Sequence, residues 1–134
     1  MNIFINLPVK DLQKTNAFYK GLGFEFNPHF SNEAATCMQI NDQAWVMLLT
    51  EAYFKTFTKK EISDASRTTE VLVAIDQKSK EEVDRFIDKV QQLGGTEARG
   101  IQDLGFMYSR AFNDPDGHIW EVFWMDPAQI PDNK

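Results

Sequence analysis

Short runs of β-forming residues and one helical pattern follow each other in the first half of the chain. The run at 3–9 (IFINLPV) predicts a strand. Asp11 then offers the N-cap of a helix that ends at Gly21 and Gly23, because glycine readily adopts the backbone conformation found at helix C-termini. Three further strands are predicted at 24–27, 35–40 and 44–49. The first half is therefore predicted to have the order βαβββ.

The same order of elements recurs in the second half. A β-branched run at 69–75 predicts a strand, and Ser79 then starts a capping box with Glu82. Apolar residues follow with helical spacing until Gly94 and Gly95 end the helix. Three strands are predicted at 96–98, 106–112 and 118–124. The chain is thus predicted to be α+β and to contain a duplicated βαβββ module.

The length of 134 residues is typical of one domain, and we expect a single domain over residues 1–134. The pattern divides this domain into a first module, a connector, a second module and a tail, at 3–49, 50–68, 69–125 and 126–134. The connector is polar with a few aromatic residues, which predicts a link with one short helix. A lid or a dimer-contact segment is the alternative, because long loops in compact domains often serve binding.

Charge and cysteine content exclude several classes of partner. The chain has 14 Lys+Arg and 20 Asp+Glu, so its formal net charge is −6. Nucleic acids and anionic membranes bind basic surfaces, and we therefore expect neither as a partner. Cys37 is the only cysteine, which precludes an intramolecular disulfide and favours a cytoplasmic location. No apolar run approaches the roughly 20 residues of a membrane span, and the N-terminus does not resemble a signal peptide.

Several segments carry a resemblance to a known family. They lie at 6–12 (NLPVKDL), 17–19 (AFY), 21–24 (GLGF) and 114–124 (DPDGHIWEVFW). They resemble the vicinal oxygen chelate superfamily, which contains glyoxalase I, bleomycin-resistance proteins and extradiol dioxygenases, and they are most similar to small bacterial lactoylglutathione lyase-like proteins. The resemblance covers residues 3–125. It implies the glyoxalase/bleomycin resistance/dioxygenase fold, in which two βαβββ modules form paired half-barrel cups.

The resemblance also implies positions for a metal site. In metal-dependent members, up to four side chains from corresponding strands bind a divalent metal that acts as a Lewis acid. Carried onto this chain, two of these positions fall on the apolar Phe4 and near the apolar Leu48. The other two fall on Glu70 and Glu121, which can ligate a metal. Asn6 lies two residues beyond Phe4 on the same side of its strand and offers an amide to substrate. Such a set suits Mg²⁺ or Mn²⁺ better than tightly bound Ni²⁺ or Zn²⁺.

Glu121 is the strongest single candidate for chemistry. It stands in an otherwise apolar strand, where a carboxylate is costly unless it is paired or functional. We predict it as a metal ligand and as the catalytic residue, either through the metal or as a general base. The alternative is an ion pair with a positive group such as Arg110 or Arg99. For Glu70 the alternative to a ligand is a solvent-facing carboxylate at the start of a strand.

A second candidate group precedes the final hairpin. Phe106, Tyr108 and Arg110 share one face if their strand is continuous. Two aromatic rings and a guanidinium suit a planar or anionic small molecule, so we predict these residues as substrate-binding. The alternative is core packing with an ion pair at the rim.

Three functions remain open from the sequence. The first is an enzyme similar to glyoxalase I, a metal-dependent lyase that uses Glu121. The second is a metal-free protein of the bleomycin-resistance type that binds and sequesters a small molecule. The third is a dimeric ligand-sensing module. Because family members of this length usually build or pack their cups across a two-fold axis, the resemblance also implies a homodimer.

Overall fold

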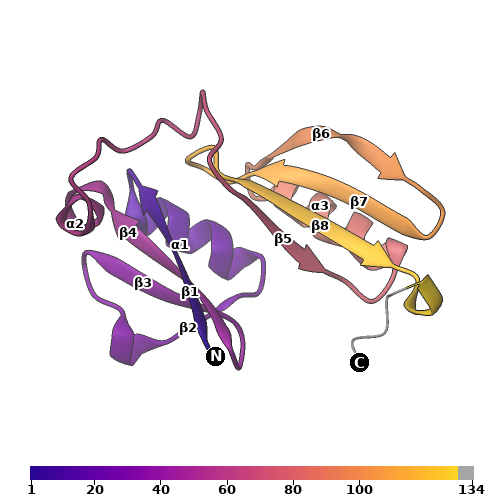
Figure 1. The fold of residues 1–134 in the computed structure, drawn as a ribbon, viewed down its shortest axis with the longest axis horizontal. Coiled ribbons are helices and arrows are strands. Elements are labelled where there is room, and N and C mark those ends of the chain that lie inside the picture. Colours follow the sequence, from indigo (N-terminus) through magenta and orange to yellow (C-terminus); the bar gives the residue numbers. More distant parts are fainter. Residues whose placement is uncertain (130–134) are drawn as a thin grey trace. The chain divides into compact units, whose positions relative to one another are not determined.

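The computed structural model describes residues 1–129, and its contacts divide the chain into two compact units (Figure 1). Unit 1 is Met1–Asp64 and unit 2 is Ala65–Lys134. Each unit holds a four-stranded sheet and one long helix, and the elements follow each other as βαβββ in both. The predicted α+β fold class and the duplication of the module are therefore confirmed.

Unit 1 consists of β1 (Ile3–Val9), α1 (Leu12–Gly21), β2 (Glu25–Phe26), β3 (Ala35–Asn41) and β4 (Ala44–Thr50). Its sheet has the order β1-β4-β3-β2, in which β1 runs parallel to β4 and the other pairs are antiparallel. A short 3-10 helix, η1 (Pro28–Phe30), follows β2. As predicted, Asp11 is the N-cap of α1, and its carboxylate accepts a hydrogen bond from the Lys14 N–H over 3.1 Å.

Helix α1 covers one face of the unit 1 sheet. The Thr36 hydroxyl on β3 donates to the Asn16 side chain on α1 over 2.7 Å, so Thr36 faces the helix. Leu48 on β4 pairs with Thr36 and therefore faces the helix as well. Val46 alternates with Leu48 in the same direction, and both side chains are fully buried. These residues form the helix-side core of unit 1.

Unit 2 repeats this plan with β5 (Leu72–Asp76), α3 (Lys80–Gln92), β6 (Thr96–Asp103), β7 (Met107–Asn113) and β8 (Ile119–Met125). The sheet order is β5-β8-β7-β6, and β5 runs parallel to β8. Helix α3 packs on β6, β7 and β8 and covers one face of this sheet (Figure 1). The helix side of unit 2 contains fully buried residues from both the helix and the strands: Val83, Ile87, Val90, Phe112, Trp120 and Val122.

Helix α3 begins where the capping pattern predicts. Ser79 is its N-cap, and the Ser79 hydroxyl accepts a hydrogen bond from the Glu82 N–H over 3.1 Å. The Glu82 carboxylate accepts in return from the N–H of Lys78, the residue before the N-cap, over 3.4 Å. The first bond satisfies a backbone donor that a helix N-terminus would otherwise leave unpaired, and the second pairs the N–H of the residue that precedes the N-cap.

Two strands of unit 2 differ from the prediction by three residues or more at one end. β5 begins at Leu72 instead of 69, because Leu72 pairs with Ile119, the first residue of β8, and no partner strand extends further back. β6 continues to Asp103 instead of ending at 98. Its polar residues and Gly100 conceal the strand in the sequence, because it is an edge strand that pairs on one side only.

The connector predicted at 50–68 contains α2 (Glu51–Phe54) and a 3-10 helix, η2 (Lys55–Phe57), which confirms its one short α-helix. The boundary between the two units falls inside this segment. Neither these helices nor any other in residues 1–129 is long and apolar enough to cross a membrane.

The predicted tail spans 126–134. Its first residues contain a short 3-10 helix, η3 (Pro127–Gln129), and residues 130–134 lie outside the described part of the chain.

A tight turn joins β7 to β8 in unit 2. The buried Asp114 carboxylate accepts hydrogen bonds from the N–H groups of Asp116 and His118 over 3.0 and 2.9 Å. Gly117 has a φ of +92°, and a Cβ at this position would lie 2.8 Å from the Ala65 carbonyl oxygen. Only glycine therefore satisfies both the backbone angle and the close approach of the neighbouring segment.

We predict that Gly117→Ala lowers the free energy of unfolding by about 2–4 kcal/mol, because the new methyl group adds a steric clash to a strained φ. Urea denaturation followed by circular dichroism measures this loss. Gly23→Ala is the matched control: Gly23 has a similar φ of +101°, but a Cβ added there would meet no atom within 4 Å. The control should lose only about 1 kcal/mol. Equal losses in the two variants would show that the contact with Ala65 has no effect.

Candidate functional site

In each unit the helix covers one face of the sheet. We call the opposite face the open face of that unit. In unit 2, Arg110 on β7 donates to Asp84 on α3, so Arg110 faces the helix. Strand alternation places its neighbour Ser109 on the open face, together with Phe123, which pairs with Ser109. Glu121 lies two residues before Phe123 on β8 and therefore points to the open face as well.

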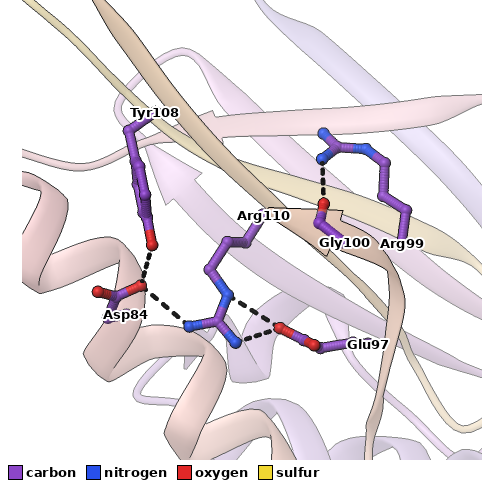
Figure 2. Close-up of polar contacts among 6 residues, drawn as sticks. All are labelled: Asp84, Glu97, Arg99, Gly100, Tyr108 and Arg110. Carbon is purple, nitrogen blue, oxygen red and sulfur yellow. Dashed lines mark hydrogen bonds and ion pairs between the residues drawn. The ribbon is translucent and has the colours of Figure 1, made fainter. Parts of the chain in front are cut away.

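Arg99 on β6 reaches Glu121 across the open face of unit 2. Its Nη2 lies 3.4 Å from Glu121 Oε1 and donates to Ser109 Oγ over 2.7 Å. Its Nη1 donates to the Gly100 carbonyl oxygen over 3.2 Å, a contact drawn in Figure 2. The Arg99 and Glu121 side chains are 32% and 30% exposed, whereas Ser109 is buried. Of the two partners considered for Glu121, the structure selects Arg99 over Arg110.

Glu70, the other carboxylate predicted to bind a metal, lies before β5 instead of inside it and is exposed. In the register of β5 and β8, Ala74 pairs with Glu121. Glu70 lies four residues before Ala74, in a bend that precedes the strand. Carboxylates that share one hard cation lie within about 2.6 Å of it. Glu70 is exposed outside the sheet, and in residues 1–129 no group of three or more His, Cys, Asp or Glu side chains that could hold a metal joins it to Glu121.

The open face of unit 1 carries an aromatic pair. Trp45 alternates with the helix-facing Val46 and so lies on the open face, and its register partner is Phe4 on β1. The two rings stack with centroids 4.8 Å apart and planes at 12°, and Phe4 remains 53% exposed. Asn6 is exposed two residues further along β1 and, as predicted, shares this face. An aromatic stack thus occupies the position that the resemblance implies for the first metal ligand.

Leu48, the second apolar position implied by the resemblance, is buried on the helix side of unit 1. It therefore points away from the open face altogether. Its neighbours Met47 and Leu49 face the open side, and neither offers the oxygen or nitrogen atom that a hard divalent cation prefers.

Tyr108 and Arg110 belong to a polar network on the helix side of unit 2 (Figure 2). The Tyr108 hydroxyl and Arg110 Nη1 both donate to Asp84 Oδ1, over 2.7 and 2.9 Å. Arg110 also donates through Nε and Nη2 to the Glu97 carboxylate. Tyr108 and Arg110 share one face of their strand, as predicted, and this face is opposite to the one that carries Glu121. Their alternative, packing with an ion pair, describes what they do.

This network shifts the pKa values of its members. Burial raises the pKa of Asp84, but the hydrogen bonds from Tyr108 and Arg110 outweigh it, and the net pKa lies below the usual range. The hydrogen bond to Asp84, and then burial, raises the pKa of Tyr108. Burial lowers the pKa of Arg110, but its bonds to Glu97 and Asp84 more than offset this and raise it overall. At neutral pH the network thus holds an ionised Asp84 and a neutral Tyr108.

Phe106 does not share a strand face with Tyr108, in contrast to the prediction from the sequence. It precedes β7, in the turn after β6, and its side chain is 45% exposed. Its carbonyl oxygen accepts a hydrogen bond from the Asp126 N–H over 2.7 Å, which fixes the backbone of the turn. Of this predicted group, Tyr108 and Arg110 therefore stay together, and Phe106 lies outside their strand.

The side chains present do not fit the divalent metal site implied by the resemblance. Within residues 1–129, no three His, Cys, Asp or Glu side chains lie close enough together to hold a metal ion. Glu121 instead has a cationic partner, and the Arg99 guanidinium would compete with a metal for the same oxygen. Cys37, a further possible ligand, is buried in unit 1, and burial raises the pKa of its thiol.

The sequence did not identify Ser109 as part of a site, and it offered Arg99 only as one possible partner of Glu121. One signal was present: Ser109 lies between Tyr108 and Arg110, so alternation along a strand puts it on the other face from both. The link from Ser109 to Arg99 depends on the register between β6 and β7, which spacing alone does not reveal.

We predict that Asp84→Asn costs about 1 kcal/mol at pH 7, because it weakens two charge-assisted hydrogen bonds on a partly exposed helix surface. The folded-state pKa of Asp84 is lowered, so its contribution is present above the unfolded value near 3.8 and is lost as the pH falls through the folded value. The difference in stability between wild type and variant should therefore shrink between pH 5 and pH 3. Thermal denaturation at several pH values measures it.

Asp88→Asn is the control for this prediction, because Asp88 lies exposed on the same helix. It should change stability by less than about 0.5 kcal/mol at every pH. A deficit of Asp84→Asn that stays constant down to pH 3 would contradict the charge-based account.

Comparisons with known proteins agree with this fold. The family model described as "Bleomycin resistance protein-like N-terminal" matches residues 2–41. A solved hypothetical protein from S. aureus is 28% identical, with a TM-score of 0.79 over 92% of this chain and 93% of its own. A glyoxalase-related enzyme from Fulvimarina pelagi is 23% identical, with a TM-score of 0.77 over 92% and 87% of the two chains. No curated protein sequence matches the chain.

A fosfomycin resistance protein, FosX from Listeria monocytogenes, has the same fold. It is 24% identical, and its TM-score is 0.66 over 89% of this chain and 85% of its own. That protein, as a single-site mutant, was solved in complex with Mn(II) and dihydroxypropylphosphonic acid. The fold is therefore compatible with a divalent metal. Together, the family-model match over residues 2–41 and the fold shared along nearly the whole chain support the resemblance to the vicinal oxygen chelate superfamily.

Proposed function

We propose that this protein binds a small molecule without a metal, as bleomycin-resistance proteins do, and that the open faces of its two sheets are the binding surfaces. The observation that supports this most strongly is the partner of Glu121. The carboxylate that the resemblance assigns to a metal lies 3.4 Å from the Arg99 guanidinium. An arginine in this place neutralises the carboxylate and removes the need for a cation.

The polar group on unit 2 suits recognition of a ligand. Arg99 and Glu121 are about a third exposed (32% and 30%), so both remain accessible, and both lie on the open face with Ser109 and Phe123. Ligand sites commonly combine apolar walls with a few fixed polar groups of this kind.

The stacked rings of Phe4 and Trp45 support the same function on unit 1. They present an aromatic surface on the open face, with the amide of Asn6 on the same strand. An exposed ring surface favours planar ligands through stacking and burial of apolar area. Neither ring offers a metal ligand, so this face favours binding over metal-dependent chemistry.

Two further features belong to this proposal. We place the protein in the cytoplasm, because its one cysteine is a buried free thiol. We also infer a homodimer, because the edge strands β1 and β5 expose large apolar residues, Ile3 at 55% and Leu72 at 53%. Edge strands with exposed apolar residues tend to pair or become covered.

Metal analysis tests the proposed function. The purified protein is dialysed against a chelator, loaded with Mn²⁺, Ni²⁺ or Zn²⁺, dialysed again and measured by elemental analysis. We expect far less than one metal per chain, because Arg99 already pairs with Glu121. Glu121→Gln should retain the same amount as wild type. One metal per chain that is lost in Glu121→Gln would instead support a metal-dependent lyase similar to glyoxalase I.

Light scattering tests the dimer. We expect twice the mass of the single chain at micromolar concentration, and Leu72→Lys should shift the equilibrium toward the monomer because it places a charge on the β5 edge. Asp76→Lys, on the same strand and also exposed, is the control for a change of charge alone. A monomer at all concentrations would contradict the proposed dimer. It would not affect the ligand-binding proposal, which the metal analysis tests separately.

A further inference from the structure

Arg99 has hydrogen-bonding capacity that its protein partners do not use. A guanidinium carries five N–H donors in a planar fork. The contacts of Arg99 with described residues involve only Nη1 and Nη2: Gly100 accepts from the first, and Ser109 and Glu121 accept from the second. The side chain is 32% exposed on the open face of unit 2. A ligand that approaches this face can therefore reach N–H groups of Arg99.

The bond between Arg99 and Glu121 is long for its type. Charge-assisted hydrogen bonds from a guanidinium to a carboxylate are usually about 2.7–2.9 Å. The distance here is 3.4 Å and involves one nitrogen and one oxygen, so the pair lacks the two parallel bonds of an optimal geometry. The bond from the same nitrogen to Ser109 is 2.7 Å, which holds the arginine in place. Ser109 thus positions Arg99, while Glu121 balances its charge weakly.

Arg110 shows the opposite arrangement in the same sheet. Its side chain is only 12% exposed, and it has two carboxylate partners, Asp84 and Glu97. Its Nη1 bond to Asp84 is 2.9 Å and its Nε bond to Glu97 is also 2.9 Å. Two carboxylates therefore balance the charge of Arg110, which is turned toward the helix, so of these two arginines Arg99 is the one suited to an external anion.

We propose that Arg99 takes the place of the metal cation in this chain and binds an oxyanion of the ligand. The ligand class is a small molecule with a carboxylate or phosphonate group, whose two oxygens match the spacing of the guanidinium fork. Glu121 then acts as an internal competitor that the oxyanion displaces. The proposal rests on the proposed function, because it names the ligand class for the open face of unit 2.

The test uses benzoate and phenylphosphonate as probes and benzamide as the neutral match in shape. Binding is followed at constant ionic strength by two-dimensional ¹H–¹⁵N NMR, including the Nε–H signals of arginine. We expect saturable shifts of the Arg99 signal with the two anions and none with benzamide. A response to benzamide equal to that of benzoate would overturn the proposal, because the oxyanion would then contribute nothing.

Arg99→Gln should weaken binding of the anions at least tenfold. Arg85→Gln is the matched control, because it removes the same charge from an exposed site on α3, where Arg85 is 71% exposed. The control should bind like wild type, and the NMR spectra of both variants report whether the fold is intact. Equal loss in the two variants would show a general effect of charge and overturn the role of Arg99.

Glu121→Gln should have the opposite effect on anion binding. We expect anion binding to become several-fold tighter, because the variant removes the competing carboxylate and keeps the shape of the side chain. Weaker binding would mean that the carboxylate itself contacts the probe, which would overturn the proposal. The two hypotheses fail separately: a bound metal overturns metal-free binding, whereas a metal-free protein that ignores both anions overturns only the oxyanion site.

Discussion

The packing of one helix on one face of each four-stranded sheet determines where every candidate residue lies. Because side chains alternate along a strand, covering one face with α1 or α3 turns the other half of the side chains to the open face. In unit 2 this single constraint separates Arg110, which bonds to Asp84 on α3, from Glu121. In unit 1 it buries Leu48 and leaves Trp45 available for its stack.

The sequence predicts the parts of the fold that depend on local chemistry. Asp11 and Ser79 cap the helices as expected, and glycines end them, because caps and helix ends are decided within a few residues. It cannot predict what depends on register between strands. Glu97 and Arg99 are two residues apart and would share a face on a regular strand, yet they pair with Phe112 and Ala111, which face opposite sides. An irregularity in the register between them makes this possible, and spacing does not reveal it.

The same limit explains where the structure places the other candidate site residues. Tyr108 and Arg110 have the correct residue types for a ligand site, but residue type carries no information on which face α3 covers. Their hydrogen bonds to Asp84 join β7 to the helix, so both residues stabilise the unit on the helix side of the sheet. The prediction of Glu121, in contrast, depends on an apolar context that makes an unpaired carboxylate costly. That argument holds at any register, and it leads to a residue that the structure pairs with Arg99.

An arginine in the place of a metal changes the chemistry available on the open face. A bound metal acts as a Lewis acid, and zinc can lower the pKa of a bound water to about 7. A guanidinium carries a permanent positive charge and offers only hydrogen bonds and charge. It stabilises an anionic group that the ligand already carries, but it does not activate water. With a net charge of −6, the chain as a whole repels anions, so affinity must come from the fork of Arg99 itself. Arg99 and Glu121 are therefore suited to holding an anion and poorly suited to converting it.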